Sequence, residues 1–226
     1  MPDAPRLLIP AGTRFGYHEG PPWRRRELSL VRADQDILIG PGLHLLVAPN
    51  GSGKTTLLRT LAGLLPCLQG GARMDGCVHY FADELRADPE LKARTFFRSW
   101  FHGAALDQAF ALATSLRLDL NRPVAQLSRG NRQKLLLILA EVKAAFAGGG
   151  LLLMDEPLTG LDAETREQVI ALWAASAATT VRLVILHELE SVRSADTLLS
   201  IHGGLLRHVR ERTGGSWMDS YKSLQA

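Results

Sequence analysis

The segment from Leu45 to Leu58 constrains the fold of this chain more than any other stretch. It combines an apolar run typical of a buried strand, a turn that contains Gly51 and Gly53, and a helix expected to open at Lys54. Glycines leave room for backbone N–H groups to curl around an anion, and a helix start adds unpaired N–H groups and the positive end of its dipole. The order strand, turn, helix therefore predicts an α/β protein with a phosphate-binding loop.

The polar side chains of this loop suit a bound polyphosphate. Lys54 supplies a point charge that can reach β- and γ-phosphates, and the Thr55 hydroxyl is a ligand type that Mg²⁺ accepts. Ala48 takes the first loop position, where glycine is common, and costs little there if its φ is negative. We expect the phosphates to contact the loop residues Ala48, Pro49, Asn50, Gly51, Ser52, Gly53, Lys54, Thr55 and Thr56.

Composition excludes several classes of protein. With 46% hydrophobic and 22% charged residues the chain is ordinary for a soluble globular protein. No apolar run approaches the roughly 20 residues that cross a bilayer, residues 1–6 do not resemble a signal peptide, and Cys67 and Cys77 form no metal-binding pattern. We therefore expect a cytosolic protein. Its net charge of +3 permits contact with anionic lipid or nucleic acid without arguing for either.

Aromatic residues before the loop are candidates for stacking on a nucleotide base. Residues 7–9 and 28–31 have the character of short strands, and the glycines and prolines between them predict a turn over residues 14–23. Tyr17 is our candidate for stacking and Trp23 its rival. An aromatic side chain that only covers a sheet edge is the alternative.

The middle of the chain is expected to be largely helical. A helix is predicted over residues 55–65, a strand over 78–81, and a helical region over 88–124. We favour a small helical core for the aromatic residues of this region, and a groove that docks a partner helix is compatible with it. Four aromatic residues there share helical spacing: Phe96, Phe97, Trp100 and Phe101.

Two carboxylates follow a wholly apolar strand in the second half of the chain. Residues 151–154 are Leu, Leu, Leu and Met, and Asp155 and Glu156 come directly after them. A fully apolar strand indicates a sheet covered on both faces, and ligands of parallel α/β sheets bind at the carboxyl ends of the strands. Asp155 therefore suits the Mg²⁺ shell, and Glu156 is placed to orient or deprotonate a water molecule.

One polar segment, at Ser128, precedes this strand, and a second one, ending at Asp162, follows it. Ser128 is expected to cap a helix that reaches about residue 146, and Asp162 to start a helix that runs to about residue 178. A further buried strand over residues 180–186 ends next to His187. Because this strand follows the carboxylate strand by one helix, we expect the imidazole of His187 to lie beside the same crevice.

In this order, the motifs resemble the ATP-binding cassette (ABC) family of nucleotide-binding domains over most of the chain. The resemblance identifies the phosphate loop as Walker A, Asp155 as the Walker B aspartate, Glu156 as the catalytic base and His187 as the sensor of the γ-phosphate. Residues 158–162 resemble the D-loop, with Asp162 as its last residue. Tyr17 matches the aromatic residue that stacks on adenine.

The signature segment departs from the family pattern. Family members commonly have Leu-Ser-Gly-Gly-Gln, whereas this chain has Ser128, Arg129, Gly130 and Asn131 after the leucine. In the family this segment contacts the ATP held by the opposite subunit, so the resemblance implies a head-to-tail dimer around two ATP. Asp83 takes the place of the glutamine-loop residue and would add a carboxylate near Mg²⁺.

The resemblance also implies the architecture. It predicts an α/β fold: a P-loop NTPase core with a mostly parallel sheet flanked by helices, an N-terminal antiparallel β portion and an inserted helical subdomain. We expect a single ABC domain over residues 1–226, with the core at about 1–85 and 128–226 and the helical subdomain at about 86–127.

The function implied is that of the ATP-hydrolysing subunit of an ABC transporter, with ATP and Mg²⁺ as cofactors. The chain would act as a homodimer, or as a heterodimer with a second ABC subunit, on separate transmembrane subunits. It would lie in the cytoplasm, on the inner face of the membrane. The departures in the signature favour export over import.

Two other functions are weaker alternatives. A soluble ABC-type ATPase acting on nucleic acid or ribosomes would be expected to carry a second cassette, a coiled-coil insertion, zinc-type cysteines or a long basic tail, and none is evident. We therefore expect no nucleic-acid partner. A P-loop kinase or GTPase is disfavoured by the signature, by His187 and by the lack of an Asn-Lys-x-Asp motif.

Overall fold

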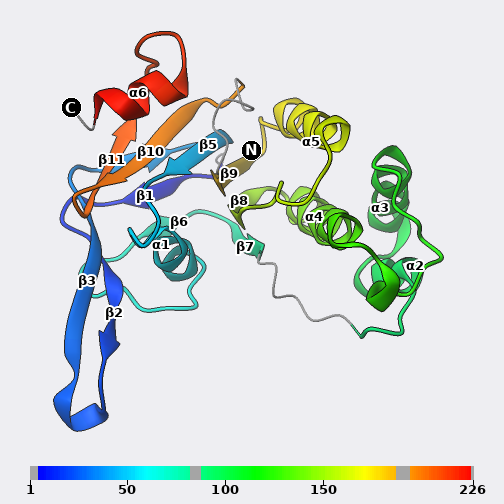
Figure 1. Cartoon of the computed structure of the whole chain (residues 1–226), viewed down its shortest axis with the longest axis horizontal. Coiled ribbons are helices and arrows are strands. Elements are labelled where there is room, and N and C mark those ends of the chain that lie inside the picture. Colours follow the sequence, from blue (N-terminus) through cyan, green and yellow to red (C-terminus); the bar gives the residue numbers. More distant parts are fainter. Residues whose placement is uncertain (1–4, 82–87, 187–193, 225–226) are drawn as a thin grey trace.

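The computed structural model describes residues 5–81, 88–186 and 194–224 (Figure 1). The helices are α1 (Lys54–Leu61), α2 (Ala93–Trp100), α3 (Gly103–Ser115), α4 (Arg129–Phe146), α5 (Ala163–Ala175) and α6 (Trp217–Ser223), with short 3-10 turns η1 (Pro22–Arg24) and η2 (Val124–Gln126). The strands are β1 (Leu7–Ile9), β2 (Arg14–Glu19), β3 (Arg26–Ala33), β4 (Ile37–Ile39), β5 (Gly42–Val47), β6 (Arg73–Met74), β7 (Cys77–Phe81), β8 (Gly150–Asp155), β9 (Thr180–Ile185), β10 (Thr197–His202) and β11 (Leu205–Val209).

One large sheet organises these elements. Its eight strands run in the order β2-β3-β11-β10-β5-β9-β8-β7. The run from β10 to β7 is parallel, whereas β2 pairs with β3 and β10 with β11 in antiparallel register. A second, antiparallel sheet has the order β4-β1-β6. The mostly parallel sheet with an antiparallel N-terminal portion is therefore as the sequence predicted.

Alternate residues of the central strands enter two apolar layers, one on each face of the large sheet. In β5, Leu45 belongs to the layer that contains α4 and α5, and Leu46 to the layer that contains α1. In β8, Leu152 and Leu153 are divided in the same way. Helices or the small sheet cover both faces, which explains why these strands are apolar throughout.

The helices α2 and α3 pack on α4 and not on the large sheet (Figure 1). Three of the four aromatic residues in this region, Phe96, Phe97 and Phe101, are buried. Trp100 alone is exposed, at 45%, and the Lys143 ammonium lies 3.5 Å from its ring centroid. The interpretation of these residues as a helical core is confirmed, and the docking of a partner helix beside it stays a prediction.

Several helices and strands begin or end at other residues than the sequence predicted. The segment expected to be a turn over residues 14–23 begins with the strand β2, and only its end turns. Gly16 fits this strand because a Cβ there would lie 2.0 Å from the Leu28 carbonyl oxygen. The helix α1 ends at Leu61 because Gly63 adopts a φ of 74°, and the Leu64 N–H then donates to the Arg59 carbonyl.

Among the described residues, no helix is long and apolar enough to span a bilayer.

Two histidines share one threonine hydroxyl across β5, β10 and β11. Thr197 Oγ1 lies 2.8 Å from His44 Nδ1 and 3.0 Å from His208 Nε2. His44 Nε2 lies 2.9 Å from the Gly40 carbonyl oxygen and must therefore carry the proton. His44 Nδ1 then accepts from Thr197, and His208 Nε2–H donates to Thr197. This arrangement requires the His44 imidazole to be neutral. The Nδ1 atom of His208 is buried without a hydrogen-bond partner in the described part of the chain, so a second proton on His208 would be unpaired there.

Acid is expected to destabilise the fold through this network. Burial, helped by the charge of Arg210, lowers the pKa of His208 to about 4, and burial also lowers the pKa of His44. The unfolded chain therefore binds protons first, so this stability is complete above about pH 6.5 and is lost as the pH falls toward 4. For His208, which is partly exposed, we expect a loss of about 1–2 kcal/mol.

Urea unfolding between pH 7 and pH 4 measures this loss. His208→Gln should show a shallower fall in the free energy of unfolding, because its side chain does not titrate. His202→Gln, at an exposed position of β10, is the matched control and should keep the full pH dependence. Equal slopes in all three proteins would contradict a role for His208.

Candidate functional site

The phosphate loop connects the buried strand β5 to α1. Gly51 and Gly53 have φ of 77° and 95°, left-handed values that favour glycine. A Cβ at Gly53 would also lie 2.9 Å from side-chain atoms of Leu30 and Val31, so β3 holds the loop closely from one side. Ala48 does not have a positive φ, so the alanine at the first loop position carries no left-handed strain.

Lys54 lies across its own loop. Its Nζ donates to the carbonyl oxygens of Ala48 at 2.9 Å and Pro49 at 3.0 Å. The hydroxyl of Ser52 is buried and has no hydrogen-bond partner within the described part of the chain. The loop therefore holds one cation and one hydroxyl donor that a phosphate can engage. Asn50 is exposed and Thr56 is half-buried beside them.

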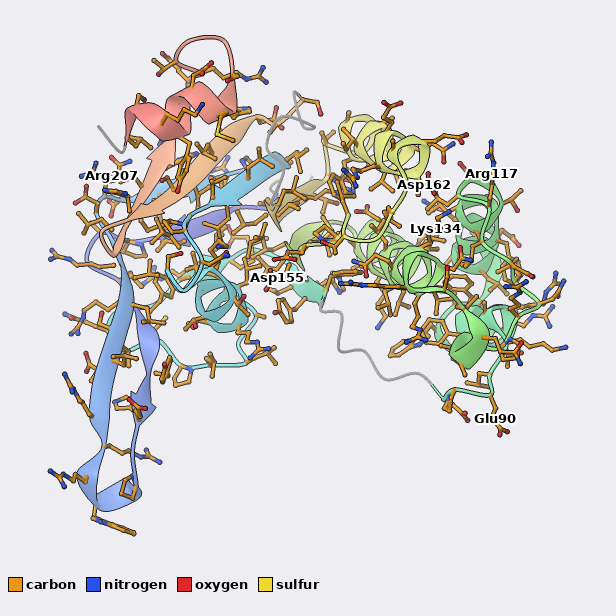
Figure 2. The ribbon with its side chains drawn as sticks, viewed as in Figure 1. Glu90, Arg117, Lys134, Asp155, Asp162 and Arg207 are labelled. Atoms are coloured by element: carbon orange, nitrogen blue, oxygen red, sulfur yellow. The ribbon has the colours of Figure 1, made fainter. Side chains whose placement is uncertain are left out.

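Thr55 and Asp155 meet although 100 residues separate them in the chain. Thr55 stands in the first turn of α1, and Asp155 is the last residue of β8. The Thr55 hydroxyl donates to Asp155 Oδ2 over 2.7 Å. Figure 2 shows Asp155 at the end of its strand, on the side of the sheet edge where α1 begins. A hydroxyl beside a carboxylate is a donor set that suits Mg²⁺.

Glu156 has an unusual backbone conformation next to this pair. Its φ is 51°, a left-handed value that costs a non-glycine residue on the order of 1 kcal/mol. The Glu156 N–H donates to the Ile185 carbonyl over 3.1 Å, and its own carbonyl accepts from the Thr159 N–H over 3.1 Å. These bonds from β9 and the following turn fix the position from which the carboxylate projects.

Gln133 completes this support, and sequence reasoning assigned it no role. Its side chain is 3% exposed on α4, and its amide donates to the carbonyls of Glu156 at 3.3 Å and Pro157 at 3.0 Å. The sequence signal was a polar residue five positions after Ser128, on a helix that buries most of its length. That signal does not reveal which backbone groups the amide reaches.

The start of α4 is packed against the segment that follows Glu156. Ser128 caps α4, and its Oγ accepts from the Asn131 N–H. A Cβ at Gly130 would lie 2.6 Å from the Gly160 carbonyl oxygen, so only glycine permits this approach. On the other side, the Arg129 side chain runs past Gly160. The segments that resemble the signature and the D-loop are thus in direct contact.

Asp162 is held from three directions at the start of α5. Its carboxylate accepts from the Thr165 N–H at 2.8 Å and from the Thr165 hydroxyl at 3.0 Å. These bonds, the backbone one first, lower the pKa of Asp162. Lys134 of α4 points toward it, with Nζ 3.9 Å from Asp162 Oδ2, as Figure 2 shows. Lys134 Nζ also donates to the Leu116 carbonyl, which ties α4 to the end of α3.

Register separates the two candidates for base stacking. Tyr17 stands opposite Leu28, two residues from Leu30, which packs against Gly53 of the phosphate loop. Cross-strand partners share a face of the sheet, so Tyr17 lies on the same face as Leu28 and Leu30. Arg26 lies about 13 Å along the strand from Leu30. Trp23 lies in η1, further from Leu30 than Arg26 does. The geometry favours Tyr17 for stacking.

Tyr17→Ala should weaken ATP binding by about 5- to 100-fold, because base–aromatic stacking is worth about 1–3 kcal/mol. Tyr17→Phe keeps the ring and should bind within about threefold of the unmodified protein. Trp23→Ala should change affinity by less than about twofold. Equilibrium titration with a fluorescent ATP analogue measures all three. A larger loss in Trp23→Ala than in Tyr17→Ala would reverse the assignment.

Two predicted site residues fall outside the described residues. Asp83, expected at the glutamine-loop position, lies between the described ranges 5–81 and 88–186. His187, expected to sense the γ-phosphate, follows the described strand β9 and its neighbour Leu186. Their roles stay predictions.

Fold and site together define a P-loop nucleoside triphosphatase. A family model described as ABC transporter matches residues 41–159, more than half of the chain. This chain belongs to the ABC transporter family, as the sequence motifs suggested, and it is an ATPase of that family.

Curated relatives agree with this assignment. Over 148 residues the chain is 35% identical to the cytochrome c biogenesis ATP-binding export protein CcmA of Novosphingobium aromaticivorans, covering 64% of this chain and 73% of the relative. It is 35% identical over 178 residues to the aliphatic sulfonates import ATP-binding protein SsuB 1 of Pseudomonas fluorescens, covering 75% and 66%. It is 29% identical over 232 residues to the mycobactin import ATP-binding/permease protein IrtB of Mycolicibacterium smegmatis, covering 89% of this chain and only 37% of IrtB.

Solved structures show the same fold. A bacterial Atm1-family ABC exporter with ATP bound superposes with a TM-score of 0.75 at 18% identity, covering all of this chain and 43% of the exporter. The ATP-binding cassette MJ0796, in a dimeric post-hydrolysis state bound to ADP and Pi, gives a TM-score of 0.70 at 18% identity, covering 92% of this chain and 99% of MJ0796. The predicted P-loop fold class is confirmed.

Proposed function

We propose that this chain is the ATP-hydrolysing subunit of an ABC transporter. One observation carries the proposal: Thr55 of the phosphate loop bonds Asp155, and the next residue, Glu156, is held in a strained conformation at the same sheet edge. The proposed phosphate site, metal site and carboxylate base would thereby be adjacent. Strain held in place by surrounding bonds is common at catalytic positions.

The proposed roles follow from the contacts. The N–H groups of the phosphate loop and the Lys54 ammonium would hold the β- and γ-phosphates, for which Lys54 would leave its bonds to Ala48 and Pro49. Thr55 and Asp155 would hold Mg²⁺, which supplies charge neutralisation on the phosphate oxygens. Glu156 would orient the attacking water and accept its proton.

A second copy of the chain completes the proposed site. The signature residues Ser128 to Asn131 would contact the γ-phosphate of ATP bound by the opposite copy. Support comes from the close contact of this segment with residues 158–162, where Gly130 packs against the Gly160 carbonyl. The Gln133 amide donates to the backbone carbonyl of Glu156, so α4 of each copy is also bonded to the residue proposed as that copy's own catalytic base. ATP binding to one copy would therefore also affect the position of Glu156 in the other copy.

Transport would require transmembrane subunits, and the chain would lie on the cytoplasmic face of the membrane. We propose export as the direction, on the departures at Arg129 and Asn131 alone, since the names of relatives divide between export and import.

Purification of the tagged chain from gently solubilised membranes tests this proposal. We expect a multi-span membrane protein to co-purify in a fixed ratio, and ATP hydrolysis to rise in its presence. The matched control is the tagged chain with Ser128→Arg, which should still co-purify but lose the stimulation. Co-purification of nucleic acid or ribosomes, without any membrane protein, would contradict the proposal and support the soluble alternative.

A further inference from the structure

The tip of the β2–β3 hairpin concentrates exposed cationic and aromatic side chains. Between Gly20 and Arg26 the sequence is Gly-Pro-Pro-Trp-Arg-Arg-Arg, with three positive charges and no acidic residue. Trp23 is 87% exposed, the highest value among the exposed large hydrophobic side chains of the described chain, and the three arginines are exposed as well. The hairpin carries this tip away from the rest of the molecule (Figure 1).

The fold does not use these side chains. Some arginines elsewhere on the described surface pair with carboxylates, as Arg14 does with Glu27 and Arg207 with Asp34. Within the described chain, the side chains of the three tip arginines have no ion pair. The Trp23 ring packs into neither hydrophobic layer. The tip therefore presents an unpaired cationic and aromatic surface to the solvent.

The backbone of the hairpin tip has a defined conformation in the absence of a partner. The strand pairing extends to the Glu19–Arg26 pair, and the Arg24 N–H bonds the Pro21 carbonyl over 2.8 Å within η1. Pro21 and Pro22 fix their own φ angles and limit the conformations of the turn. Binding of a partner would therefore cost the tip little conformational entropy.

We propose that this tip binds the surface of an anionic phospholipid membrane. An indole has an apolar body and a polar N–H, and tryptophan accordingly collects at the boundary between headgroups and acyl chains. Guanidinium groups form charge-assisted hydrogen bonds to phosphate oxygens, and basic side chains are attracted to the negative membrane surface. Trp23 would enter the interface while Arg24, Arg25 and Arg26 bind headgroups around it.

The shape of the tip favours lipid over nucleic acid. Proteins that bind single strands line a groove with several aromatic platforms in succession. Here one aromatic side chain stands at the projecting end of a hairpin, a form that can insert into an interface but cannot follow a strand. The proposal concerns a surface away from the nucleotide site and does not depend on transport or its direction.

Vesicle flotation of the full chain tests the proposal. Unmodified protein should float with vesicles of phosphatidylserine and phosphatidylcholine, and not with phosphatidylcholine alone. Replacing Arg24, Arg25 and Arg26 with Gln should lower the affinity on the order of a hundredfold, since each basic residue contributes about fivefold at such a surface. The control replaces the exposed Arg6, Arg73 and Arg98 with Gln, lowers the formal net charge from +3 to zero equally, and should stay within about threefold.

Brominated lipids give a second readout. They should quench part of the tryptophan emission of the unmodified protein, and Trp23→Ala should remove that quenching. Equal urea midpoints will show that the variants fold. Equal losses in the tip and control variants, or quenching that persists in Trp23→Ala, would overturn the proposal. Tip-dependent binding of an oligonucleotide without any binding to vesicles would overturn it as well.

Discussion

Glu156→Gln is expected to lower the rate of ATP hydrolysis by a factor on the order of 10²–10⁴, the usual contribution of a positioned base. The amide keeps the shape of the side chain but cannot accept a proton from water. The bonds from Gln133, the Thr159 N–H and Ile185 involve the backbone of Glu156, so the substitution leaves them in place. The Thr159 hydroxyl, which donates to Glu156 Oε2 over 3.5 Å, can donate to the amide oxygen instead. Lys54 and the Thr55–Asp155 pair are also untouched, and ATP should bind within about threefold.

Steady-state release of phosphate, with ATP affinity from equilibrium titration, measures this effect. Glu167→Gln, at an exposed position on α5, is the matched control and should hydrolyse ATP at the normal rate. Gln133→Leu supplies an intermediate case, because it removes the support of Glu156 and leaves the carboxylate itself. A Glu156→Gln protein that turns over normally would remove Glu156 from the catalytic machinery.

Glu141→Ala is expected to destabilise the fold by about 3–5 kcal/mol. Glu141 of α4 and Arg182 of β9 are 5% and 2% exposed and form a bidentate pair, with N–O distances of 2.8 and 3.2 Å. Arg182 also donates to the hydroxyl and carbonyl of Ser176, where α5 ends. Removing the carboxylate leaves a buried guanidinium without its counter-charge, which is why the loss is large.

Urea unfolding measures the loss, and two comparisons isolate its cause. The double variant Glu141→Leu/Arg182→Met replaces the pair by apolar side chains and should be far more stable than Glu141→Ala. Glu164→Ala breaks the pair with Arg117, which has similar bidentate geometry but is solvent-exposed, and should cost less than about 1 kcal/mol. Equal losses in Glu141→Ala and Glu164→Ala would contradict the importance of burial.

The parts of the fold that depend on local pattern could be predicted from the sequence. The apolar run of β5, the two loop glycines and the helix start are consecutive, so their order alone predicts the phosphate loop. Asp155 and Glu156 stand at the end of a strand whose composition indicates burial on both faces. The aromatic cluster was assigned to a core by its helical spacing, and the burial of Phe97 agrees.

Features that depend on distant contacts could not be predicted in this way. Gly16 was taken as a turn residue, although it is a glycine because the Leu28 carbonyl approaches it within a strand pair. The amide of Gln133 finds its partners in the backbone 23 and 24 residues further along, which no local pattern specifies. The choice between Tyr17 and Trp23 likewise needed the register of β2 and β3.

The oligomeric state of Glu156→Gln in the presence of ATP tests the shared-site account most directly. Size-exclusion chromatography with light scattering should show a monomer without nucleotide and a dimer with Mg²⁺ and ATP, because uncleaved ATP keeps the two halves together. Ser128→Arg in that background should restore the monomer while ATP still binds at Lys54. A dimer that forms without ATP and survives Ser128→Arg, or an ATP-bound protein that stays monomeric, would contradict a site shared between Lys54 of one copy and Ser128 of the other.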